Sequence, residues 1–252
     1  MTHKHICAGV ERVAEADLKP TRSTVPLLAW WADRDTALST LAAIDGGPVF
    51  KDVAVCYEHP TIVGGKGRGK ASMTDIFVQH SDGAIAIEGK WRERRYAIVR
   101  EWSRKSANRA AVLEYWLGLI RPLCAGPPAL LADVDDVVYQ MLHRIAAACG
   151  AAAKFGRALV VYQVFDGYGH ERAHKYIADL ELAARALRPG PRLRLALLRV
   201  PVEVTDTWRE LAVVARRKED RPGVVAEIRR RIGDRGALFR FGSPDVRMIA
   251  PE

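Results

Sequence analysis

Hydrophobic and polar positions along the chain follow two different periods, and the periods predict the elements. Apolar residues recur at helical spacing in four segments, 27–47, 100–120, 133–155 and 169–190. Five other segments are predicted strands, 49–59, 74–80, 83–91, 157–165 and 192–204. Segment 157–165 is continuously apolar, which is typical of a strand buried on both faces.

The order of these elements is helix, three strands, helices, strand, helix and strand. It predicts a mixed α/β domain in which a sheet is sandwiched between helices. Breaks in the hydrophobic pattern divide the chain into three predicted parts. We expect an N-terminal arm or helix over 1–24, a main domain over 25–205, and a basic C-terminal extension with helical stretches over 206–252.

Composition narrows the class of protein. The chain has 252 residues, of which 49% are hydrophobic, enough for a well-buried core. No apolar run approaches the ~20 residues needed to span a bilayer, and the N-terminus lacks the apolar core of a signal peptide. The four cysteines have no zinc-ligand spacing, so reduced thiols are expected. These features predict a cytoplasmic protein that does not bind membranes.

The chain is basic, with a formal net charge of +9 and a pI of about 9.6. This excess of positive charge favours a polyanionic partner, and nucleic acid is a stronger candidate than an anionic membrane surface. Many basic proteins bind neither, so charge alone is weak evidence for a polyanionic partner.

A glycine-rich stretch, GGKGRGKA, begins at Gly64 and fits the phosphate-binding loop pattern up to Lys70. A working loop then needs Ser or Thr, where this chain has Ala71, and it needs a following helix, where a strand is predicted. A nucleotide-hydrolysing loop is therefore disfavoured. Lys66, Arg68 and Lys70 either contact a phosphate backbone or belong to a solvated connector.

The predicted hairpin at 74–91 gathers charged groups on one face. Alternation in a strand places Glu88 and Lys90 on the same side of an otherwise apolar segment. A turn near Asp82 and Gly83 places Asp75 opposite Gly89 or Lys90, within about a residue of Glu88. Two carboxylates of this kind suit Mg²⁺ or Mn²⁺. The alternative is an exposed hairpin face with an ordinary ion pair.

The pattern TDIFV, a short turn and IAIEGK resembles the PD-(D/E)XK nuclease superfamily. The resemblance implies a restriction-endonuclease-like fold in which Asp75, Glu88 and Lys90 are catalytic. Asp75, Glu88 and the backbone carbonyl of Gly89 would hold the metal. Thr74 replaces the proline that usually precedes the aspartate.

The resemblance extends to YQMLHR and the strand after it, and implies supporting roles for Gln140 and Arg144. His143 on the same segment is interpreted as a satisfied polar group. Many members use one more acid, for which Glu58 is the main candidate and Asp33 and Asp35 are weaker ones. The chain also resembles a narrower bacterial family without an assigned function, over roughly 49–184.

The expected function is a Mg²⁺-dependent (or Mn²⁺-dependent) nuclease, with DNA favoured as substrate, and a homodimer is compatible with this reading. Basic residues in the glycine loop and after the second hairpin strand are candidate backbone contacts: Lys66, Arg68, Lys70, Arg92, Arg94 and Arg95. Arg229, Arg230 and Arg231 form a second candidate surface, or a solvated helix face. The competing hypothesis is an inactive module that binds nucleic acid or a protein partner, and a nucleotide-hydrolysing enzyme is a distant third.

Overall fold

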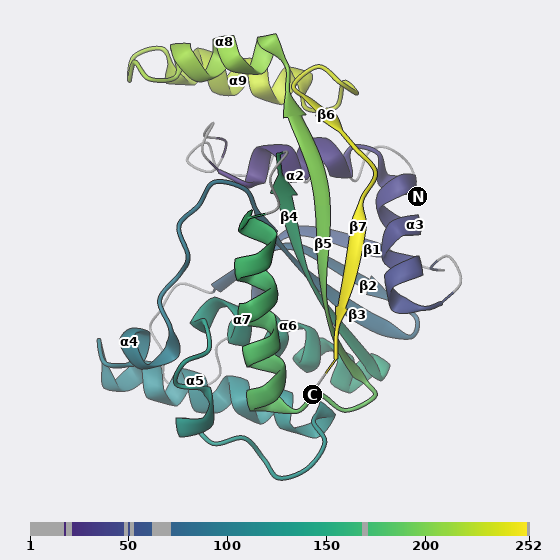
Figure 1. Cartoon of the computed structure of the whole chain (residues 1–252), viewed down its shortest axis with the longest axis vertical. Coiled ribbons are helices and arrows are strands. Elements are labelled where there is room, and N and C mark those ends of the chain that lie inside the picture. Colours follow the sequence, from purple (N-terminus) through teal and green to yellow (C-terminus); the bar gives the residue numbers. More distant parts are fainter. Residues whose placement is uncertain are drawn as a thin grey trace.

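The computed structural model describes residues 18, 22–47, 50, 53–61, 72–167 and 171–250. In this part of the chain an open sheet of seven strands is flanked by helices (Figure 1). The strands are β1 Ala54–Thr61, β2 Ser72–His80, β3 Gly83–Lys90, β4 Arg157–Asp166, β5 Leu193–Val204, β6 Phe239–Phe241 and β7 Asp245–Ile249. Their order is β1-β2-β3-β4-β5-β6, and β7 also pairs with β5.

The sheet is mixed, which confirms the predicted α/β class. β1, β2 and β3 are antiparallel neighbours, whereas β3, β4 and β5 run parallel. Parallel neighbours need a crossover connection, and the intervening helices supply it. The helices are α2 Thr24–Trp31, α3 Arg34–Asp45, α4 Val99–Ser103, α5 Ala107–Ile120, α6 Tyr139–Phe155, α7 Glu171–Leu187, α8 Asp206–Val214 and α9 Arg221–Arg231.

Three predicted helices have different bounds in the structure. The first is two helices, because Asp33 ends the turn after α2 and its side chain accepts a hydrogen bond from the Thr36 amide at 3.4 Å. Gly46 ends α3 in a left-handed conformation, as its position predicted. Segment 100–120 is likewise divided into α4 and α5, and the helix expected from 133 begins at Tyr139.

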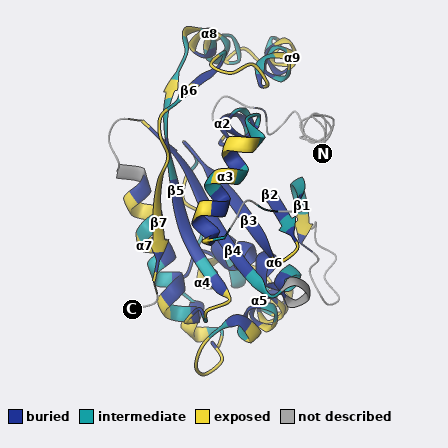
Figure 2. Cartoon of the chain, turned by 90° about the vertical axis from the view of Figure 1, so that its right-hand side faces the viewer, coloured by how far each residue is buried: buried dark blue, intermediate teal, exposed yellow. Residues whose placement is uncertain are grey.

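Both faces of the central strands β3 and β4 are buried, whereas β7 is mostly exposed (Figure 2). One face carries Phe77, Ala86 and Val160 and packs against α5, α6 and α7. The other face packs mainly against α2 and α3 and, towards the end of β5, against α8 and α9. The alanines of α6 let this helix lie close to β3 and β4, which brings its first turns near the end of β3.

The C-terminal part contains the expected helices and two strands that the hydrophobic pattern did not predict. β7 pairs with residues 195–199 of β5, and β6 pairs with residues 202–204. We call residues 206–231, which form α8 and α9, the arm; it lies beyond the ends of the central strands (Figure 1). No helix in the described ranges has the length and apolarity needed to cross a membrane.

The predicted N-terminal arm or helix lies mostly outside the described residues. Leu18 is described and is fully buried in the core cluster that contains α2. The glycine-rich loop, with Lys66, Arg68 and Lys70, also lies outside the described residues. The element that follows this loop is the strand β2 rather than a helix, in agreement with the argument against a nucleotide-binding loop.

Candidate functional site

Strand pairing brings an acid of β1 opposite an acid of β2. Tyr57 pairs with Ile76, and continuing this register places Glu58 opposite Asp75. Glu58 has a φ of 48°, a left-handed conformation that non-glycine residues rarely adopt. Non-glycine residues with a positive φ are concentrated at functional sites, so the backbone conformation of Glu58 indicates a functional position.

The next pairing brings a third acid into the row. The β2–β3 ladder includes Ile76 opposite Ile87, so the following position sets Asp75 beside Glu88. The expected opposition of Asp75 to Gly89 or Lys90 is therefore wrong by one or two residues. The cause is the turn: its two residues are Ser81 and Asp82, because His80 pairs directly with Gly83.

Gly89 adds a hydrogen bond between β3 and β2. Its amide donates a hydrogen bond to Asp75 Oδ2 at 2.9 Å. A Cβ atom at this position would lie 3.0 Å from Leu27 Cδ2, so glycine allows α2 to pack closely behind the candidate site. The recorded contact uses the amide of Gly89, whereas the resemblance had pointed to its carbonyl.

Lys90, Glu88 and Gln140 form a closed ring of hydrogen bonds. Lys90 Nζ donates to Glu88 Oε1 at 2.7 Å and to Gln140 Oε1 at 2.8 Å. Gln140 Nε2 donates to Glu88 Oε1 at 2.6 Å. Gln140, in the first turn of α6, therefore fixes both charged side chains of β3.

Arg144, one turn further along α6, lies between the two acids. Its Nε donates to Glu88 Oε2, and its Nη2 is 3.7 Å from Asp75 Oδ1. Its Nη1 contacts His143 Nδ1, and the His143 ring packs against Trp116 with centroids 5.1 Å apart. Arg144 is thus a direct partner of the acids, while His143 packs in the core behind it.

The electrostatics of the acids differ. Burial and the nearby charge of Glu88 raise the pKa of Asp75 to about 8, against the opposing effects of Arg144 and Lys90. Burial also opposes ionisation of Glu88, but the charges of Arg144 and Lys90 outweigh it and lower the pKa of Glu88. The pKa of Lys90 is raised, because Glu88 and Asp75 outweigh its burial. The site therefore holds one well-compensated carboxylate and one under-compensated carboxylate.

These groups line one cavity of about 240 Å³. Glu58, Asp75, Glu88, Lys90, Gln140 and Arg144 all contribute to its wall. The cavity has further lining residues that the sequence analysis did not select: Arg22, Ser23, Thr24, Met73, Glu93, Tyr96 and Tyr139.

Two of these additional residues hold the site together. Lys90 Nζ lies 4.7 Å from the centre of the Tyr96 ring, a cation–π contact. Glu93 accepts hydrogen bonds from the amides of Trp91 at 2.9 Å and Arg92 at 3.1 Å, and from the amide of Ser23 before α2. Glu93 and Tyr96 follow Lys90 closely in the sequence, and this closeness is the signal that could have identified them as site residues.

The remaining predicted basic contacts have different environments. The Arg92 guanidinium lies 4.3 Å from the Trp91 ring centre, and Arg94 is exposed. Arg95 is held by α7, because its Nη2 and Nε bond the carboxylate of Asp179 at 2.6–3.1 Å. This pairing reduces the availability of Arg95 for a ligand.

The weaker acid candidates and the second basic surface lie elsewhere. Asp33 caps α3 and forms an ion pair with Arg235, and neither Asp33 nor Asp35 lines the cavity. Arg229, Arg230 and Arg231 occupy the last turn of α9, where the last two pair with Glu227. Within the described ranges, no group of three or more His, Cys, Asp or Glu residues is placed to hold a metal ion.

Comparison with known proteins identifies the family. A family model described as a domain of unknown function, DUF6946, matches residues 9–192. The chain belongs to this family. The DUF6946 match includes all residues of the candidate site and ends before β5, so the arm lies outside it. No curated protein and no solved structure gives a significant match.

Proposed function

We propose that this protein is a Mg²⁺-dependent (or Mn²⁺-dependent) nuclease of the PD-(D/E)XK type that hydrolyses phosphodiester bonds in DNA, on a restriction-endonuclease-like fold. The observation that carries this proposal is the alignment of Glu58, Asp75 and Glu88 across β1, β2 and β3. Lys90 lies on the same cavity wall. Carboxylates converging with one buried ammonium group form an arrangement suited to phosphoryl chemistry.

Asp75, Glu88 and the Gly89 carbonyl offer oxygen donors of the type that a divalent ion takes, although the described acids do not form a ready-made group of three around an ion. Arg144 Nη2 lies 3.7 Å from Asp75 Oδ1, beyond hydrogen-bond length, and burial together with the charge of Glu88 raises the pKa of Asp75 to about 8. A hard cation beside this oxygen would supply the missing charge. Asp75, Glu88 and the backbone carbonyl of Gly89 would hold it, with Glu58 as the further acid. When bound, such an ion polarises the phosphoryl group and lowers the pKa of a coordinated water.

The chain's own residues prepare the rest of the chemistry. An ammonium group has three N–H donors, and Lys90 uses two of them on Glu88 and Gln140. The third remains to orient an attacking water or to stabilise negative charge on the phosphoryl oxygens. Gln140 accepts from Lys90 and donates to Glu88, so it prevents either group from rotating out of the cavity.

One feature favours the alternative, an inactive nuclease-fold module that binds nucleic acid or a protein partner. Arg144 bonds Glu88 Oε2 and approaches Asp75, so a permanent cation already compensates part of the acidic charge. In an inactive module, this guanidinium would serve permanently in place of a metal.

Cleavage assays separate the two functions. Plasmid and linear DNA are incubated with Mg²⁺ or Mn²⁺ and the wild-type protein, and nicking is expected. Asp75→Asn and Lys90→Met should abolish it. The matched controls are Asp82→Asn in the hairpin turn and Lys105→Met, both exposed and remote from the cavity lining. Salt-sensitive binding without cleavage under either metal would favour the module.

A second readout does not depend on activity. Mg²⁺ should raise the thermal midpoint of the wild type, because a ligand that binds only the folded state stabilises it, by about 2.7 kcal/mol at a concentration 100 times its dissociation constant. Asp75→Asn should lose this increase, and Asp82→Asn should retain it. An equal response in all three proteins would contradict metal binding at this site.

A further inference from the structure

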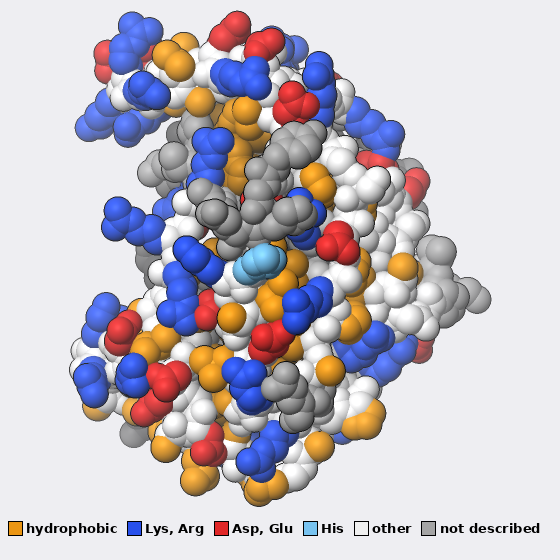
Figure 3. Space-filling model, in the orientation of Figure 1, with side chains coloured by type: hydrophobic (Ala, Val, Ile, Leu, Met, Phe, Trp, Pro, Cys, Tyr) orange, Lys and Arg blue, Asp and Glu red, His pale blue; other side chains and the backbone are white. Residues whose placement is uncertain are grey.

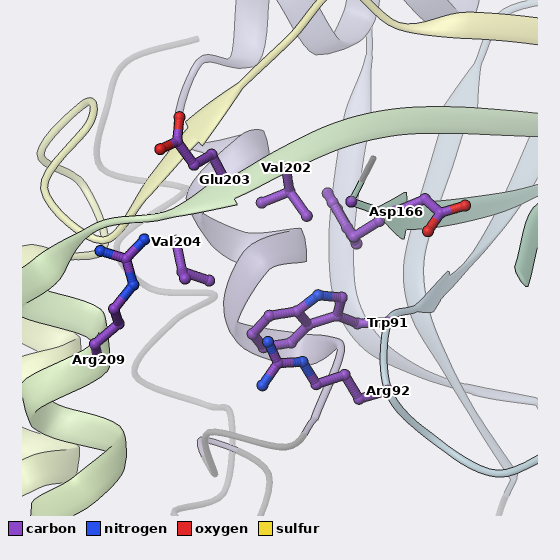
Figure 4. Close-up of a pocket in the computed structure, with 9 residues that line it drawn as sticks. Trp91, Arg92, Asp166, Val202, Glu203, Val204 and Arg209 are labelled. Atoms are coloured by element: carbon purple, nitrogen blue, oxygen red, sulfur yellow. The ribbon is translucent and has the colours of Figure 1, made fainter. Parts of the chain in front are cut away.

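A second cavity, of about 400 Å³, lies where the arm meets the end of β3. We call it the arm cavity (Figure 4). Its first wall contains Trp91 and Arg92, which directly follow Lys90 of the candidate site. Its second wall contains Val204, at the end of β5, and Arg209, from α8. Consecutive residues at the end of β3 therefore border the candidate site and the arm cavity.

The arm cavity presents a cation on each wall. The Arg92 guanidinium lies 4.3 Å from the ring centre of Trp91, a contact that fixes its direction. Arg209 is exposed and pairs with Asp206 across one helical turn, where the side chains are 55% and 89% exposed. Such an exposed pair is weak, so Arg209 can exchange it for a phosphate oxygen.

Two acids also border the arm cavity, but their carboxylates point away from the wall that contains Trp91 and Arg92. Figure 4 shows the carboxylates of Asp166 and Glu203 directed away from Trp91 and Arg92. Figure 3 shows the molecule hollowed on the side where the arm overhangs the body, with Lys and Arg side chains on both borders. The charge pattern of this side is therefore complementary to a polyanion.

The two walls are held at a fixed separation. Trp91 packs against Trp208 of α8 with ring centroids 5.9 Å apart, and Trp208 packs against Phe239 of β6 at 4.7 Å. All three side chains are buried, which makes this cluster the joint between the arm and the body. This packing anchors α8, the helix that carries Arg209, to the segment that follows β3.

We propose that the arm cavity binds the sugar–phosphate backbone of the nucleic acid strand whose reacting phosphate lies at Asp75 and Glu88. This assignment rests on the proposed function. The wall with Trp91 and Arg92 lies within the DUF6946 match, whereas the wall with Arg209 lies outside it. The arm thus adds a strand-holding element that the family domain does not supply by itself.

The test measures binding of fluorescently labelled single-stranded and duplex DNA of the same sequence, by anisotropy, over a range of salt concentrations. Arg209→Gln is expected to weaken binding about tenfold and to reduce the salt dependence by about one counterion, as the loss of one phosphate contact does. Arg92→Gln should act in the same direction from the opposite wall. Arg216→Gln is the matched control, an exposed arginine just after α8 that does not line the arm cavity.

The comparison of single-stranded with duplex DNA shows which form of DNA supplies the backbone that the arm cavity binds. A loss confined to single strands, or shared by single strands and duplexes, supports the proposal and defines the substrate. If Arg209→Gln and Arg216→Gln change binding equally for both forms, the proposal is overturned.

The proposed function fails by a different result. If the wild type cleaves no DNA with either metal, yet Arg209→Gln still weakens binding selectively, the arm cavity stands as a nucleic acid site and the nuclease proposal falls. If the wild type cleaves DNA and Arg209→Gln matches the control, the nuclease proposal stands and the arm cavity does not bind the strand.

Discussion

The candidate site and the arm each contain an ion pair between a basic residue and a glutamate, in opposite surroundings. Lys90 and Glu88 lie 2.7 Å apart, and each has a side chain only 3% exposed. On the arm, Arg230 and Glu227 lie 2.8 Å apart with side chains 62% and 29% exposed. Nearly equal distances therefore conceal very different energetics.

Exposure decides what each group of charges can do. Buried charges lose their hydration, so each must be compensated by a neighbour, and any imbalance appears as a shifted pKa. Exposed pairs are worth about 0–1 kcal/mol, because water and salt screen them. Under our proposals, the candidate site would hold a defined ion in a defined place, whereas the arm would exchange its partners for phosphates.

The largest expected effect tests the claim that Arg144 compensates the charge of the buried Glu88. Arg144→Met leaves Glu88 buried without its main cation and should reduce the free energy of unfolding by about 3–5 kcal/mol. Arg230→Met on the arm should change it by less than about 0.5 kcal/mol. Urea unfolding of both variants measures the difference, and equal losses would remove the contrast between the two regions.

A second effect follows from the pKa of Asp75. Its pKa in the folded protein, about 8, lies above the ordinary value of 3.8, so the stabilising contribution of the neutral carboxyl is fully present below about pH 4. It is lost as the pH rises towards 8. Asp75→Asn should therefore become stabilising relative to the wild type by on the order of a few kcal/mol on going from about pH 5 to about pH 8.5.

Thermal unfolding in the absence of divalent ions measures this pH dependence. Asn retains an oxygen that can accept the Gly89 amide, so the substitution removes mainly the charge. Asp82→Asn, whose carboxylate is 70% exposed, is the control and should show no comparable trend. A constant difference between Asp75→Asn and the wild type over this pH range would show that Asp75 ionises normally.

The smallest effect concerns a pair between the two extremes. Arg95 is 49% exposed and Asp179 only 9%, so Asp179→Asn should cost about 1 kcal/mol. The control is Asp136→Asn, whose partner Arg100 is 50% exposed and which should cost less than about 0.5 kcal/mol. Chemical unfolding resolves the two, and the order Asp179 above Asp136 sharpens the link between burial and energy.

The sequence determined the local features of the fold and of the site. Alternation placed Glu88 and Lys90 on one face of β3, because side chains in a strand point to opposite sides in turn. The turn residues SDG indicated the β2–β3 hairpin, and Gly46 indicated the end of α3. These predictions hold because each depends on neighbouring residues only.

The tertiary structure decided the alignment of the acids and the pairing of distant segments. Whether Asp75 meets Glu88 or Gly89 depends on strand register, which the turn geometry and all paired residues set together. The opposition of Glu58 to Asp75 depends on the pairing of β1 with β2. The strands β6 and β7 form because β5 offers them an open edge. Such contacts join residues far apart in the chain, so no local pattern encodes them.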